Sequence, residues 1–163
     1  MIRKIAWLLL LAGCGAEDPI DGTPDANTGG VQATFTSLYG DYFQNCKNCH
    51  TPAAPGRTSD TEDTLDFTSQ TTAYSTIKTG MAAGLEGNFL DCNGVPFVTA
   101  SNPSQSLLLA SLDQPTRNAF DLPTHPMCDM DAIADQTLKV GTQPSAAFIT
   151  ALKSWLTNGA QNN

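Results

Sequence analysis

The feature that most constrains this chain is the five-residue stretch Cys46-Lys47-Asn48-Cys49-His50. Two cysteines separated by two residues and followed directly by histidine form the attachment pattern for c-type haem. In that chemistry both thiols add to the vinyl groups of the macrocycle, and the imidazole ligates the iron. The alternative is a structural or redox-active CxxC pair with an incidental His50. Because the complete CxxCH pattern is present, we expect haem c on Cys46 and Cys49, with His50 as the proximal axial ligand.

Length and charge narrow the possible functions. A chain of 163 residues suits one domain, and a hydrophobic content of 40% is enough for a modest core. Eight Lys and Arg residues against sixteen Asp and Glu residues give a formal net charge of -8. Because phosphate binding needs clustered cations, this balance argues against nucleic acid as a partner. The acidic surface is either a solvated exterior or a docking surface for a redox partner.

The first thirteen residues have the pattern of an export signal. Two basic residues precede a run of seven apolar residues, and the sequence Leu-Ala-Gly-Cys then ends at Cys14. Seven apolar residues are too few to span a bilayer. The segment resembles a bacterial lipoprotein signal, which implies cleavage before Cys14 and diacylglycerol on its sulfur. An ordinary signal peptide with an incidental Cys14 is the alternative.

The resemblance to a lipoprotein signal implies an anchored protein of the bacterial cell envelope, facing the periplasm or the surface. Residues 14–30 are rich in Gly, Pro, Asp and Thr and have almost nothing to bury, as in a flexible tether. The domain then occupies residues 31–163. Gly15 follows the lipid-bearing cysteine where an inner-membrane retention signal has aspartate, so the outer membrane is favoured.

Apolar periodicity predicts an all-α domain with long irregular loops. A first helix is expected from Val31 or Gln32 to Cys46, because its apolar residues recur on one helical stripe. Within it, Gly40 marks either a close contact with another helix or a glycine on the solvent face. The stripe consists of Val31, Phe35, Leu38, Tyr39, Tyr42, Phe43 and Cys46.

Three further helices are expected. A short one covers about residues 71–78, and one opens near Pro103 and is filled by the apolar run 106–112. The last begins at Pro144 or Ser145, carries Trp155 as an aromatic anchor and ends at Gly159.

The remaining cysteines predict a disulfide. Cys14 is assigned to lipid and two others to haem, which leaves Cys92 and Cys128 in an exported protein. A bridge between them would fix the loop at residues 121–130 against the domain body. Two buried thiols are the alternative.

The same loop holds the candidates for the distal axial ligand. A thioether favours ferrous iron and raises the potential of an electron carrier, whereas a second imidazole lowers it. Met127 is preferred because it lies between Pro126 and a disulfide-bonded cysteine. Met130 and His125 are competing candidates, and Met81 is a more distant one.

Several motifs together resemble those of the single-haem cytochrome c-like lipoproteins of myxobacteria and similar bacteria. Besides a helix leading into CxxCH, they are Leu-Asp-Phe at 65–67, Ala-Tyr at 73–74, Asn-Pro-x-x-Ser-x-Leu at 102–108 and Trp-Leu-x-x-Gly-Ala at 155–160. The resemblance covers residues 31–163 and implies a class I-type cytochrome c fold, with a bridge between Cys92 and Cys128. One departure concerns the distal ligand: such proteins usually have Met-Pro, whereas this chain has Pro126-Met127.

These observations predict a lipid-anchored monohaem cytochrome that transfers single electrons between redox partner proteins. A haem enzyme or enzyme subunit with an open, peroxidase-like sixth site is the first alternative. Against catalysis, the chain has two histidines, and Arg57 and Arg117 are isolated in sequence. The second alternative is a haem-free surface lipoprotein, with Cys46 and Cys49 in a disulfide, that acts as a binding or structural module.

Overall fold

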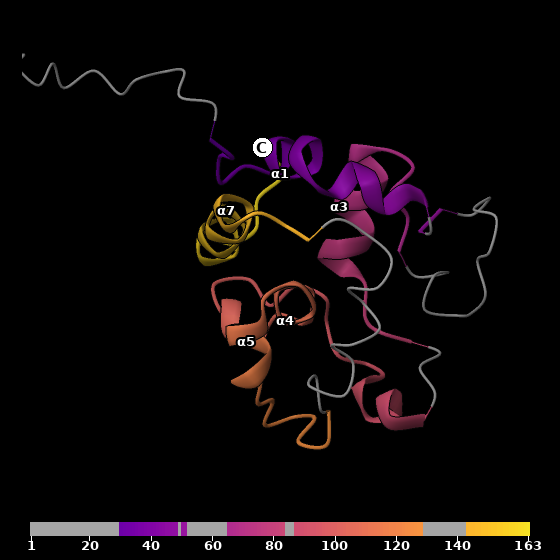
Figure 1. Cartoon of the computed structure of the whole chain (residues 1–163). Coiled ribbons are helices and arrows are strands. Elements are labelled where there is room, and N and C mark those ends of the chain that lie inside the picture. The colour runs from indigo at the N-terminus through magenta and orange to yellow at the C-terminus, as the bar shows by residue number, and fades with distance from the viewer. Residues whose placement is uncertain (1–29, 49, 52–64, 84–86, 129–142) are drawn as a thin grey trace, which may run out of the picture.

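The computed structural model describes residues 30–48, 50–51, 65–83, 87–128 and 143–163, and these residues form an all-α fold (Figure 1). The expected helical class is therefore confirmed. Within the described ranges no strand forms, and a single isolated bridge pairs Met81 with Pro96. The α-helices are α1 (Phe35–Asp41), α3 (Gln70–Thr79), α4 (Leu107–Leu112), α5 (Gln114–Asn118) and α7 (Ala146–Thr157). The 3-10 helices are η1 (Phe43–Asn48), η2 (Gly87–Cys92) and η3 (Pro103–Gln105).

The expected first helix is present as two pieces. Thr34 caps the start of α1 by accepting a hydrogen bond from the backbone N–H of Ser37. At Tyr42 the backbone leaves helical geometry, with φ -132° and ψ -51°, and the chain continues as η1. The prediction of one continuous helix is thus wrong, because a glycine and an aspartate, both poor helix formers, occupy the last two positions of α1.

The predicted apolar stripe nevertheless faces the core along both pieces. Phe35, Leu38 and Phe43 are at most 1% exposed. The other four members of the stripe are partly buried and pack against the same cluster. Phe43 and Cys46 are three residues apart, and side chains at that spacing lie one above the other in a 3-10 helix, so the change of helix type keeps them on one face.

Helix α7 has the expected bounds and supplies the other half of this core. Ser145 caps it by accepting a hydrogen bond from the Phe148 backbone N–H, and Gly159 ends it with a φ of +89°. The Phe35 ring lies 5.5 Å from the ring of Trp155, and the Phe43 ring lies 5.3 Å from that of Phe148. The first helical segment and the last are therefore joined through aromatic side chains.

Gly40 takes no part in this contact. It is exposed, and a β-carbon built on it meets no atom within 4 Å. Of the two interpretations of this glycine, the solvent-exposed position is confirmed and the close helix contact is wrong. Aromatic rings one turn before and one turn after it make the approach to α7 instead.

Helix α3 confirms the short helix expected at residues 71–78. It begins with a reciprocal capping box, in which Ser69 accepts from the Thr72 backbone and Thr72 accepts from the Ser69 backbone. Its Tyr74 ring lies 5.1 Å from the ring of Phe35, with the edge of one ring toward the face of the other. This helix therefore packs against the same aromatic core as α1 and α7.

The segment after α7 ties these three helices together. Lys78 and Tyr74 of α3 donate side-chain hydrogen bonds to the carbonyls of Gly159 and Ala160, at 2.9 and 3.0 Å. The backbone N–H of Thr36, in the first turn of α1, donates to Asn163 O at 2.9 Å. Accordingly, the C-terminus lies beside α1 in Figure 1. The Thr36 bond uses a backbone donor that would otherwise be left unpaired at the start of α1.

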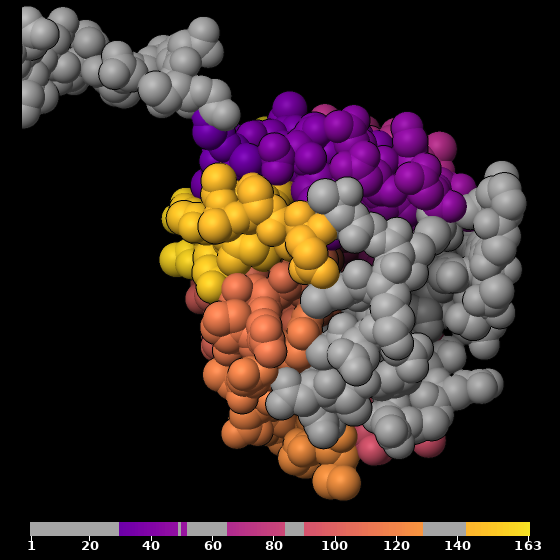
Figure 2. Space-filling model, in the orientation of Figure 1, coloured from indigo at the N-terminus to yellow at the C-terminus, as the bar shows by residue number. Residues whose placement is uncertain are grey.

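Helices α4 and α5 pack beneath α7 (Figure 2). The helix predicted to open near Pro103 is present as two pieces, η3 and α4, because the backbone at Ser106 is extended, with φ -92° and ψ 115°. Helix α5 was not predicted, since five residues are too few for a periodic pattern. Arg117 of α5 is 4% exposed and donates to the carbonyls of Ala110 and Ser111 at the end of α4. Asp113, which caps α5, forms an ion pair with Lys153 of α7 at 2.8 Å.

The environment of Asp113 lowers its pKa. Partial burial raises the pKa of this carboxyl, but hydrogen bonds from Lys153 and Thr116 and the positive charge of Lys153 outweigh that effect. The carboxylate therefore remains ionised in the folded protein and links α5 to α7.

Cys92 and Cys128 form a disulfide, as predicted. Both cysteines are buried, at 0% and 6% exposure, and the bridge closes a loop with a sequence separation of 36 residues. The expected lipoprotein signal at 1–13 and most of the tether at 14–30 lie outside the described residues, as does Cys14. No helix in the described part of the chain is long and apolar enough to cross a membrane.

We expect replacement of both Cys92 and Cys128 by serine to lower the free energy of unfolding by about 3–4 kcal/mol. Cross-linking a loop of this length restricts the unfolded chain by that amount in the chain-entropy description. Denaturant unfolding of the oxidised protein and of the double variant measures the difference. A change below about 1 kcal/mol would contradict the expectation.

A pair of glycine substitutions should have opposite effects. A β-carbon at Gly80 would overlap Thr76 O and approach the Phe97 ring to 3.0 Å, so Gly80→Ala should destabilise by about 1–3 kcal/mol. Gly40→Ala meets no neighbour and should stabilise α1 by about 0.5–1 kcal/mol. Thermal unfolding of the two variants beside the parent gives both signs, and a loss of stability in Gly40→Ala would refute the open position assigned to that residue.

Candidate haem-attachment site

Cys46 lies on η1, at the point where the first helical segment leaves the aromatic core. It is half-buried and packs against the hydrophobic cluster. The intervening residues Lys47 and Asn48 are exposed, so the two positions between the motif cysteines face solvent. Cys49 lies outside the described residues. The structure thus places one of the two predicted attachment residues at the edge of the core.

Two backbone hydrogen bonds hold His50. Its N–H donates to Cys46 O at 2.9 Å, which closes one turn over the motif. Its carbonyl accepts from the Phe67 N–H at 2.8 Å, which connects the motif to a segment seventeen residues later. Because both peptide groups of His50 are bonded, the position of its imidazole depends chiefly on its side-chain torsions.

The His50 imidazole packs against the aromatic core. Its ring centroid is 5.8 Å from that of Phe67, and Nδ1 is buried. The Phe67 ring lies 5.8 Å from the ring of Phe43, which packs in turn on Phe148 of α7. This chain of rings supports the histidine from the centre of the domain. Sequence reasoning placed Phe67 only in a loose motif and did not predict its contact with His50, since no spacing rule connects the two positions.

Tyr42 lies one turn before Cys46 and packs against the same aromatic core. Its ring packs 4.8 Å from the ring of Phe148. Burial raises the pKa of the Tyr42 hydroxyl, and the charge of a nearby ionised Cys46 raises it further. The hydroxyl therefore stays protonated, and a neutral phenol borders the cysteine.

The predicted distal candidates belong to a different part of the fold. His125 is partly buried, its Nδ1 lies 3.1 Å from Thr124 Oγ1, and its Nε2 lies 3.6 Å from a β-carbon built on Gly94. Met127 is 71% exposed. Their loop is fixed by the disulfide at Cys128, whose backbone N–H donates to His125 O.

The remaining methionine candidates differ in what can be said of them. Met81 is 53% exposed and pairs through its backbone with Pro96, and Met130 lies outside the described residues. His125 lies beside Gly94, which follows η2, and Met127 precedes the disulfide-bonded Cys128. Ligation by Met127 would require its side chain to turn from solvent toward the iron.

The residues present at the Cys46–His50 turn fit a covalently attached haem. The Cys46 thiol and the His50 imidazole lie on one turn and pack against aromatic rings, which suit a flat apolar macrocycle. The described ranges contain no group of three or more His, Cys, Asp or Glu residues close enough to hold a metal ion by themselves.

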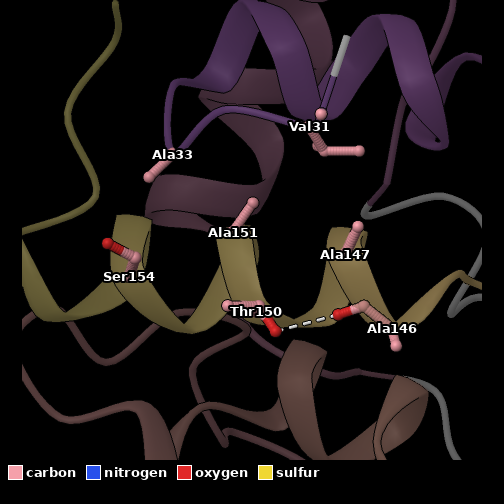
Figure 3. A pocket seen from close by; sticks show the side chains of 8 residues that line it. Val31, Ala33, Ala146, Ala147, Thr150, Ala151 and Ser154 are labelled. Atoms are coloured by element: carbon pink, nitrogen blue, oxygen red, sulfur yellow. Dashed lines mark hydrogen bonds between the residues drawn. The ribbon is translucent and has the colours of Figure 1, made fainter. Parts of the chain in front are cut away.

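A separate shallow groove of about 490 Å³ lies between α7 and the segment that enters α1 (Figure 3). It contains neither Cys46 nor His50. Uncharged and mostly small residues line it: Gly30, Val31, Ala33, Ala146, Ala147, Thr150, Ala151 and Ser154.

Comparison with known proteins gives no relative for this chain: no family model, no curated protein and no solved structure matches it.

Proposed function

We propose that residues 31–163 are a class I-type monohaem cytochrome c domain that transfers single electrons. The observation that carries this proposal is the closed turn from Cys46 to His50, packed against Phe67. It presents a haem-attachment pattern at the edge of an aromatic core, with its ligand residue held by two backbone hydrogen bonds. The haem would supply the one-electron redox couple.

In this proposal Cys46 and Cys49 carry the thioether bonds and His50 is the proximal axial ligand. Phe67 keeps the His50 imidazole in place, and the Phe43 and Phe148 rings behind it exclude water from that side. Rigid ligation keeps the reorganisation that accompanies electron transfer small, which suits a carrier. The Tyr42 hydroxyl, whose pKa is raised by burial, stays neutral and would add no charge near the Cys46 attachment.

The distal ligand remains a choice among Met127, Met130 and His125. Met127 has the sequence position that first recommended it, and the disulfide at Cys128 holds its backbone near a fixed point. Its exposed side chain supports a second candidate function, that of a haem protein with an open sixth site able to bind peroxide or another small ligand. The two functions differ in whether that position is filled at rest.

The proposal includes a lipid anchor in the cell envelope. Lipid on Cys14 would hold the domain at a membrane, with the outer membrane favoured, and the Gly- and Pro-rich tether would let it reach soluble or membrane-bound redox partners. The low content of Lys and Arg argues against a nucleic acid partner.

The first test is covalent haem in protein produced in an export host with c-type maturation machinery. The parent should stain for haem on a denaturing gel, and Cys46→Ala with Cys49→Ala together should abolish the stain, because both thioether bonds are lost. His50→Ala should reduce it strongly. Lys47→Ala and His125→Ala are matched controls that should retain it, and an unstained parent would refute the cytochrome function.

The second test assigns the distal ligand from the oxidised spectrum. A sulfur-to-iron charge-transfer band in the near infrared is expected if a methionine ligates. We expect Met127→Leu to remove it and Met130→Leu to preserve it. Loss in Met130→Leu alone would transfer the assignment to Met130. A parent without the band that binds carbon monoxide rapidly would instead support the open-site function, and slow binding would favour His125.

A further inference from the structure

We propose that the surface around the Cys92–Cys128 disulfide docks a redox protein whose own contact face has an apolar centre bordered by Lys and Arg. The proposal rests on the electron-transfer function and names the kind of partner. The docking surface is defined by Met81, Leu90, Asp91 and Asp121.

The first observation is the distribution of exposed apolar side chains. Among the described residues, the large hydrophobic side chains that are exposed are Met81, Leu90 and Met127, at 53%, 60% and 71%. All three belong to residues 79–128, and none belongs to α1, α3 or α7. Large apolar side chains gathered on one part of a surface mark an interaction site more often than scattered ones do.

Contacts within the fold bring these side chains to one region. Leu90 is two residues from Cys92 on η2, and Met127 is adjacent to Cys128, to which Cys92 is bonded. Backbone hydrogen bonds between Ala82 and both Gly94 and Val95 hold the Met81 segment against the chain that follows η2. The disulfide and these bonds make this region a fixed platform, which favours docking with little rearrangement.

The second observation is the sign of the surrounding charge. Within residues 79–83 and 87–128, the acidic residues are Asp91, Asp113 and Asp121 and the basic one is Arg117, and Asp113 is paired with Lys153 of α7. The Arg117 side chain is 4% exposed and bonded to the end of α4, so it presents almost no charge to a partner. Asp91 and Asp121 are exposed.

This combination identifies the chemistry of the partner. Apolar contacts give a short-lived complex its close approach, and charges of opposite sign accelerate encounter and orient it. A partner with a basic border is attracted to this surface, whereas an acidic one is repelled.

The test uses a basic mitochondrial cytochrome c as the probe. In stopped-flow measurements one electron leaves the reduced protein and reduces the ferric probe to its ferrous form. Asp91→Asn with Asp121→Asn should lower the second-order rate constant about three- to tenfold at low ionic strength and flatten its salt dependence. Leu90→Ser should lower the rate at low and high ionic strength. Met127 is left unchanged because it is also a candidate iron ligand.

Asp41→Asn, a change at an exposed carboxylate on α1, is the charge control for Asp91→Asn and Asp121→Asn made singly, and should leave the rate within about twofold of the parent. An equal effect of this control would show that net charge alone sets the rate and would overturn the docking surface. Unchanged rates in both the Asp91/Asp121 and the Leu90 variants would also overturn it.

A second readout is independent of haem. Carbodiimide should couple Asp91 or Asp121 to lysines of the probe, and peptide mass spectrometry should locate the bonds there rather than at Asp41. Bonds at Asp41 alone would refute the surface. A protein without covalent haem that still couples through Asp91 or Asp121 would contradict the cytochrome function while leaving the docking surface supported.

Discussion

The packing of the first helical segment on α7 is the interaction on which the rest of the structure depends. Phe35 and Phe43 contact Trp155 and Phe148 across more than a hundred residues of chain. Burying an aromatic or aliphatic side chain of this size contributes about 1.5–3 kcal/mol, and paired rings add about 0.5–1.5 kcal/mol. Because η1 carries Phe43 and Cys46 on the same stripe, this contact also fixes the start of the CxxCH motif.

Polar contacts reinforce this arrangement where the aromatic core ends. The segment after α7 accepts hydrogen bonds from α3 through Lys78 and Tyr74, and from α1 through Thr36. This segment therefore links α1 and α3, which also contact each other directly. At the other end, the ion pair of Asp113 and Lys153 joins α7 to α5. Helix α7 thus packs against both α1 and α4 and holds them in one domain.

Local sequence signals predicted much of this fold. Apolar periodicity predicted the segments that form α1 with η1, α3, α4 and α7. The two cysteines left after the lipid and haem assignments predicted the Cys92–Cys128 bridge. The break at Tyr42 and the existence of α5 were not predicted. Short helices are stabilised mainly by tertiary contacts, here the bonds from Arg117 to α4, and such contacts leave no periodic pattern.

Gly40 is another position whose role could be assigned only from the structure. A glycine inside an apolar stripe suggested either a close helix contact or a solvent-exposed position, and sequence alone could not decide between them. The structure decides because aromatic rings around Gly40, rather than its missing side chain, make the contact with α7. The requirement for a glycine lies instead at Gly80, where the Phe97 ring and the backbone of α3 occupy the space.

The two sides of the candidate haem site differ in how far they can be inferred. Five consecutive residues predict the proximal side, since Cys46 and His50 are joined by one turn of backbone. The distal side depends on where the disulfide places a loop more than seventy residues later. With Cys128 held by that bond and by His125 O, the backbone of Met127 is fixed, while its side chain is 71% exposed. The ligand of the sixth position in the proposed cytochrome therefore depends on long-range contacts that no local sequence pattern encodes.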